Sequence, residues 1–129
     1  MPPSLIAHMS LMVAMIVLIV VGIVFAVRKR GVWLGSHRVP AALGAVAGLA
    51  GVLTMAIAKI ANDRAHLHSP HSKGGLVALV LVLAAPVLGT LLVGGKSSLR
   101  LPHKIVGGIA IVLSIAAAVF GFVMVFGNH

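Results

Sequence analysis

Four apolar segments, each about as long as a bilayer is thick, constrain this chain more than any other feature. A helix needs about 20 predominantly apolar residues to cross the ~30 Å hydrocarbon core. Inside lipid every backbone group must be satisfied within the element, so we expect each segment to be a helix. The segments are Leu5–Val27, Val39–Ala61, Gly74–Gly95 and Ile105–Phe126.

The connections between these segments are short, which places each helix antiparallel to the next. We therefore expect an all-α membrane protein, a single antiparallel four-helix bundle over residues 1–129. Seven Lys and Arg flank the first and third connections, and three flank the second. By the positive-inside rule, loops 28–38 and 96–104 face the cytoplasm and both termini face outward. We expect the location to be the cytoplasmic membrane of a bacterium or archaeon.

Composition excludes most soluble functions. Hydrophobic residues make up 60% of the chain and charged residues 9%, against about 45–50% and about 25% in soluble domains. The net charge of +9 lies almost wholly between the apolar segments, without interleaved aromatic residues. We assign it to membrane topology and expect no nucleic-acid partner. The single acidic residue excludes paired-carboxylate catalysis, and the absence of cysteine excludes disulfides, thiolate metal sites and c-type heme attachment.

Four of the seven histidines follow a pattern. Each lies at or just inside the N-terminal end of a different expected helix: His8, His37, His71 and His103. In an antiparallel bundle these ends alternate between the two faces, which puts one pair near the outer surface and the other near the inner surface. The first and third helices are diagonal, and so are the second and fourth. Two imidazoles facing each other across the bundle axis are what six-coordinate heme b requires.

Small residues and cations lie close to these histidines. Gly75 and Gly107 each lie four residues after one of them, and Gly44 lies two turns after another. Residues at these spacings share a helix face, so the glycines leave clearance for a porphyrin edge. Four cations are candidates for contacts with propionates or with an anionic electron donor: Arg38, Lys104, Arg100 and Lys73. Contact with lipid headgroups is the alternative role for each cation.

Two alternatives stay open at this stage. Each histidine taken singly suits an interfacial position, and only the arrangement of all four favours ligation. On the third helix, His68 lies one turn before His71 and is the rival ligand, although Ser72 rather than a glycine follows it one turn later. His66 and His68 are otherwise expected to be solvated loop residues.

At these positions the chain resembles the cytochrome b561 family, especially the compact four-helix core that also occurs attached to DOMON domains. The resemblance covers nearly the whole chain and rests on the order and helix placement of several short motifs. They are His8-Met9-Ser10-Leu11-Met12, His37-Arg38, His71-x-x-x-Gly75, Pro86-x-x-Gly89 and His103-Lys104-x-x-Gly107.

The resemblance implies two heme b groups with axial pairs His8–His71 and His37–His103. It also implies a b561-like reductase that passes electrons from ascorbate or a similar small reductant to an acceptor across the membrane. Donor and acceptor are then small molecules or proteins, lipid surrounds the helices, and a homodimer is common among relatives. The 129 residues hold neither the two further helices of six-helix members nor a DOMON domain, and Ala85 stands where many relatives have a polar residue. These departures leave donor and acceptor open.

Other functions compete with this interpretation. They are a heme-bearing anchor subunit that exchanges electrons with quinol, a His-lined small transporter and a structural membrane subunit. A transporter requires ionisable residues at mid-depth, which these spans essentially lack. A structural role leaves the four-histidine pattern unexplained. We therefore favour transmembrane electron transfer.

Overall fold

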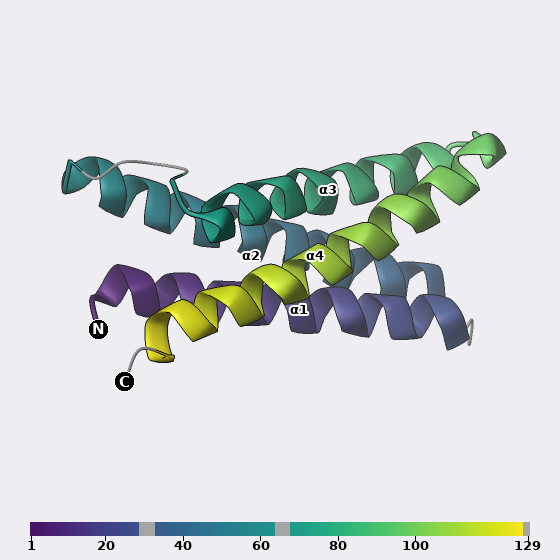
Figure 1. Ribbon diagram of the computed structural model, residues 1–129. Coiled ribbons are helices and arrows are strands. Elements are labelled where there is room, and N and C mark those ends of the chain that lie inside the picture. Colours follow the sequence, from purple (N-terminus) through teal and green to yellow (C-terminus); the bar gives the residue numbers. More distant parts are fainter. Residues whose placement is uncertain (29–32, 64–67, 128–129) are drawn as a thin grey trace.

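Four long helices make up most of the protein. The computed structural model describes residues 1–28, 33–63 and 68–127 (Figure 1). The helices are α1 (Pro3–Arg28), α2 (Trp33–Ala61), α3 (Pro70–Val93) and α4 (Arg100–Phe126), and a short 3-10 turn, η1 (Ser97–Leu99), precedes α4. All four helices are long and apolar enough to cross a membrane. The all-α four-helix fold is confirmed, and both chain ends lie at the same end of the bundle (Figure 1).

Helices α2, α3 and α4 begin four to six residues before the predicted apolar segments. Hydropathy marks only the part of a helix that suits hydrocarbon, whereas the helix itself extends to its cap. In α3 the side chain of Ser69 accepts a hydrogen bond from the N–H of Ser72, and Pro70 occupies the first turn. The histidines of these three helices therefore lie within helical backbone, which fixes their direction.

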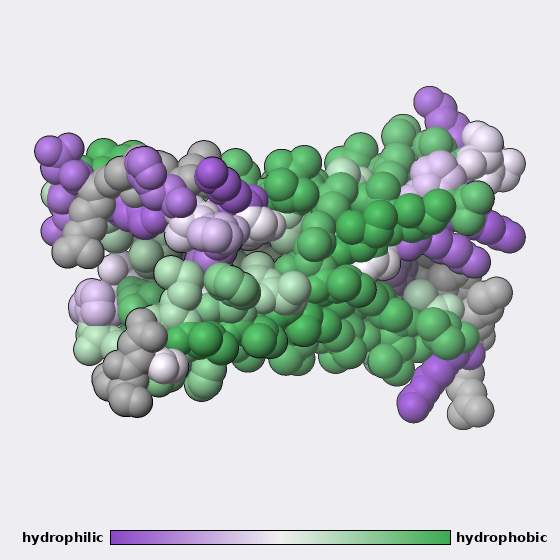
Figure 2. Space-filling model, in the orientation of Figure 1, coloured by the Kyte–Doolittle hydropathy of each residue, from purple (hydrophilic) through white to green (hydrophobic). Residues whose placement is uncertain are grey.

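The surface of the bundle is apolar around its middle. Figure 2 shows this band, with hydrophilic side chains gathered at both ends. Large aliphatic side chains such as Val13, Ile57 and Val112 point outward and are mostly exposed. Lipid solvates such side chains as well as a protein core does, so this surface suits an integral membrane protein.

The four helices associate as two hairpins. Helix α1 packs along α2 and α3 packs along α4, whereas the two hairpins touch over far fewer residues. The buried core between them is small and consists of Met15, Ala45, Val82 and Ala110 with a few partly buried neighbours. Among the described residues, the buried apolar packing between the hairpins is therefore limited to this small cluster.

Glycines of α2 let this helix lie close to α1. A Cβ on Gly44 would lie 2.9 Å from Cγ1 of Ile19, and a Cβ on Gly48 would lie 2.5 Å from the sulfur of Met15. Small residues at such positions allow close helix packing in membranes. The expectation that Gly44 gives a porphyrin clearance is therefore not met, because α1 already fills the space beside it.

Candidate functional site: two histidine pairs between the hairpins

Two pairs of histidine rings face each other across the gap between the hairpins. The ring centroids of His8 and His71 lie 6.3 Å apart, and those of His37 and His103 lie 6.1 Å apart. The planes within the pairs are nearly perpendicular, at 90° and 81°. Within the described residues, no Cα atom of α1 lies within 8 Å of one of α3, and the same holds for α2 and α4, so each ring pair joins two helices whose backbones are well apart. The structure thus brings together the two diagonal pairs expected from the sequence.

Each imidazole is held by a hydrogen bond between its Nδ1 atom and a backbone carbonyl on the other helix of its own hairpin. A carbonyl oxygen only accepts, so Nδ1 carries the proton and Nε2 keeps its lone pair. Metal-bound histidines almost always have their second nitrogen engaged in this way. The bonds are 2.8–2.9 Å long and join His8 to Gly51, His37 to Gly22, His71 to Ala117 and His103 to Ala85.

The acceptor carbonyls are regularly placed. In every helix the accepting residue lies fourteen positions after that helix's own histidine. Fourteen residues are nearly four helical turns and rise about 21 Å. The histidines therefore form two layers about that far apart, with His8 and His71 nearer the chain termini. The sequence builds the same local geometry four times.

The spacing within each pair suits a single metal atom between the rings. Each atom of an imidazole lies about 1.15 Å from the ring centroid, given bonds of roughly 1.35 Å. Metal–imidazole bonds are about 2.0–2.1 Å long. A metal held in line between two Nε2 atoms therefore separates the centroids by about 6.3–6.5 Å. The observed 6.3 and 6.1 Å lie close to this range.

Each pair supplies two protein ligands. Among the described residues there is no group of three or more His, Cys, Asp or Glu side chains placed to hold a metal. A structural zinc ion takes four protein ligands, and a catalytic one takes three. Heme iron already has four porphyrin nitrogens and needs only two axial ligands. Two facing imidazoles therefore fit heme.

A cavity of about 600 Å³ adjoins the His8–His71 pair and is lined by all four helices. Its volume falls within the ~300–1,000 Å³ typical of cofactor pockets. Gly75 lines it. A Cβ added at Gly75, or at Gly107 of α4, would have no atom of a neighbouring helix within 4 Å. Both glycines are therefore open, as the clearance role requires. The wall is otherwise apolar except for the two histidines, Lys59 and three serines.

Two further glycines make room for the imidazoles. A Cβ on Gly121 would lie 2.7 Å from Cε1 of His71, and a Cβ on Gly89 would lie 3.2 Å from Cε1 of His103. Each glycine follows, by one turn, the carbonyl that accepts the hydrogen bond of that ring. Neither glycine was expected in this role from the sequence. The available signal was a glycine eighteen residues after the histidine in both α3 and α4.

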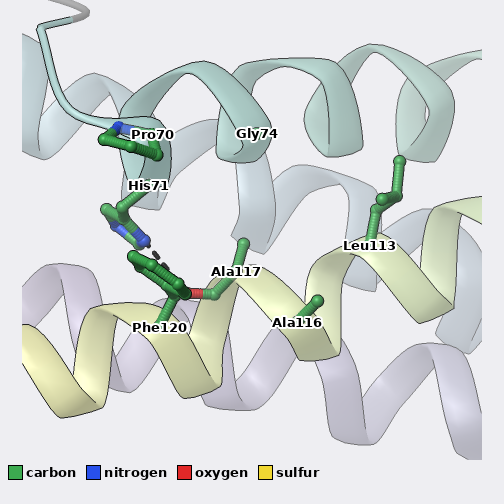
Figure 3. Close-up of a pocket in the computed structure, with 7 residues that line it drawn as sticks. All are labelled: Pro70, His71, Gly74, Leu113, Ala116, Ala117 and Phe120. Carbon is green, nitrogen blue, oxygen red and sulfur yellow. Dashed lines mark hydrogen bonds between the residues drawn. The ribbon is translucent and has the colours of Figure 1, made fainter.

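A smaller cavity of about 170 Å³ lies beside His71, between α3 and α4. Figure 3 shows the imidazole reaching from α3 to the backbone of Ala117, with Phe120 beside it. The remaining lining is apolar. This cavity therefore offers the ring room but no second polar partner.

The four candidate cations Arg38, Lys104, Arg100 and Lys73 are exposed. Only Lys73 belongs to the His8–His71 end of the bundle, where the larger cavity lies, and it does not line that cavity. Lys59, in the last turn of α2, lines it instead. The direction of a long side chain at a helix end depends on how the helix is rotated about its axis. The position of the residue in the sequence does not reveal this rotation. The residues outside the described ranges include Lys29, Arg30, Arg64, His66 and His129.

The rival ligand His68 does not face another histidine ring in the described part of the structure. It precedes the N-cap residue Ser69 and is exposed, whereas His71 lies in the first turn of α3 and faces His8. The geometry therefore favours His71 as the partner of His8.

The fold and site together define a helical membrane protein with two diagonal histidine pairs, in which each ring is hydrogen-bonded to a backbone carbonyl. A scan against protein-family models and searches of curated proteins and of solved structures found no match to this chain.

Proposed function

We propose that this chain is a transmembrane electron carrier of the cytochrome b561 type. In this proposal His8–His71 and His37–His103 are the axial ligands of two b-type hemes. The observation that carries it is the pair geometry, because the ring centroids of two imidazoles from different hairpins lie close to the spacing of a bis-imidazole metal site, and each ring binds its carbonyl through Nδ1. When bound, heme supplies one-electron iron chemistry, which no side chain of this protein provides.

The hydrogen bonds to carbonyls define the part played by the chain. They lock each ring in one tautomer, fix the ring's orientation and make the imidazole a more basic ligand. Two protein ligands per site leave no open axial position, which favours electron transfer over oxygen binding. The histidines thus select the type of redox chemistry.

The two ligand layers support transfer across a membrane. Their separation of about 21 Å compares with about 30 Å for the hydrocarbon core, which supports a position of one layer toward each surface. The largely apolar wall of the cavity at His8–His71 suits a cofactor kept away from water. The outward positions of Lys59 and of the surface cations suit a cofactor's anionic edge and an anionic donor such as ascorbate. Loops 28–38 and 96–104 are proposed to face the cytoplasm.

Purification with adequate heme supply tests the proposal directly. We expect about two b hemes per chain, with a reversible spectral change between the oxidised and dithionite-reduced forms. The measurements are a heme assay normalised to protein and absorption spectra of both states. A vesicle assay with reductant outside and ferric acceptor inside then tests transfer. A colourless protein contradicts the proposal.

A glycine substitution tests the fit of the His71 ring. Gly121→Ala places a methyl group 2.7 Å from Cε1 of His71 in the present backbone, so the ring must leave its present position and its spacing to His8 changes. We expect the heme-to-protein ratio to fall from about two toward one. Gly108→Ala is the matched control on the same helix, because its Cβ meets nothing within 4 Å. Equal heme content in the two variants would show that the ring position is unimportant.

A further inference from the structure

Ser114 of α4 is a buried polar residue in an otherwise apolar region. Its side chain is 3% exposed, and its hydroxyl oxygen is buried without a hydrogen-bond partner. It lines the same cavity as His8 and His71. An unpartnered hydroxyl costs free energy in such surroundings, and its presence calls for a physical reason.

The repeated helix pattern supplies a comparison for this residue. Ser114 lies three residues before Ala117, whose carbonyl accepts the hydrogen bond from His71. At the equivalent position of α3, three residues before Ala85, the chain has Val82, which is also 3% exposed. The two histidine layers have the same ligands and the same kind of hydrogen bond, and at this helix position one has a buried hydroxyl where the other has the isopropyl group of a valine.

We propose that Ser114 sets the redox potential of the His8–His71 site below the value that its apolar wall alone would give. This inference rests on the proposed function, since it concerns the metal that the pair would hold. Ser114 gives the two similar sites different redox potentials. The His37–His103 site then has the higher potential, so electrons favour it. Ser114 does not coordinate the metal. It acts through the dipole of its hydroxyl group, which stabilises the positive charge of the oxidised centre.

The sign follows from charge. A porphyrin with ferric iron and two neutral imidazoles carries one more positive charge than the same centre with ferrous iron. An apolar cavity disfavours the more highly charged state. A hydroxyl without a fixed acceptor is free to turn its oxygen lone pairs toward that charge and stabilise it. Removing the hydroxyl should therefore favour the reduced state and raise the potential.

Spectroelectrochemical titration of the heme-loaded full chain in nanodiscs tests this inference. Ser114→Ala is expected to lower the ferric-to-ferrous ratio of the His8–His71 site about three- to tenfold at a fixed potential, where tenfold corresponds to 59 mV for one electron. The other site should keep its potential. The reciprocal variant Val82→Ser should lower the potential of the His37–His103 site. The variants His71→Ala and His103→Ala each keep heme at one site only, so their titrations assign the two redox transitions to the two sites.

The outcomes separate this inference from the proposed function. A selective rise in Ser114→Ala together with a selective fall in Val82→Ser supports the inference. Unchanged potentials, equal shifts of both sites, or loss of heme from Ser114→Ala overturn it, while two hemes in the unsubstituted protein leave the proposed function standing. An unsubstituted protein that binds no heme overturns both.

Discussion

His71→Ala is expected to retain one heme of two, and His103→Ala is expected to lose the other. Each substitution removes one of only two protein ligands at its site, and the facing imidazole alone does not give six-coordinate iron. The other pair lies about 21 Å away along the bundle, so its rings and carbonyl partners stay intact. The heme-to-protein ratio should therefore fall by about half in each variant, with a different spectral component missing in each.

His68→Ala is the matched control for His71→Ala. His68 is exposed and lies outside α3, so its loss should leave both hemes in place. The double variant His71→Ala, His103→Ala should contain almost no heme. Loss of heme from His68→Ala with full content in His71→Ala would show that the structure assigns the wrong ligand on α3.

Heme loading is expected to raise the thermal stability of the protein strongly. The hairpins touch over few residues, whereas each histidine pair joins α1 to α3 or α2 to α4 across the gap. A ligand bound only by the folded state, at a thousand times its dissociation constant, contributes about 4.1 kcal/mol per site. Two such sites should raise the unfolding temperature by more than about 10 °C.

The measurement compares melting of the heme-loaded and heme-free full chain in the same detergent. Heme added to the His71→Ala, His103→Ala double variant is the control and should change the unfolding temperature little. Comparable melting of loaded and heme-free wild-type protein would mean that packing between the hairpins, and not ligation, holds the bundle together.

Much of the fold could be predicted because hydropathy is a local property. An apolar run of the right length must be helical in lipid, and short connections leave only antiparallel neighbours. The helix starts were less well predicted, because a cap such as Ser69 lies outside the apolar run that marks the span. The predicted orientation of the loops depends on charge relative to a membrane and stays a prediction.

In the candidate site, too, some features could be predicted from the sequence and others could not. The spacing of His8, His37, His71 and His103 relative to the four spans by itself indicates two facing pairs. Helix rotation decided which neighbours serve them. Gly44 packs against α1, Gly121 receives the ring of His71, and Lys59 rather than Lys73 lines the cavity.

The sequence by itself determined a four-span helical protein with one histidine at the start of each span, because these features follow from residue order along single helices. Only the tertiary structure decided that His71 and not His68 faces His8, which carbonyls accept from the four rings, and that Ser114 is buried without a partner. These features depend on how one helix is rotated against another. That rotation is set by packing between side chains far apart in sequence, and no local pattern records it.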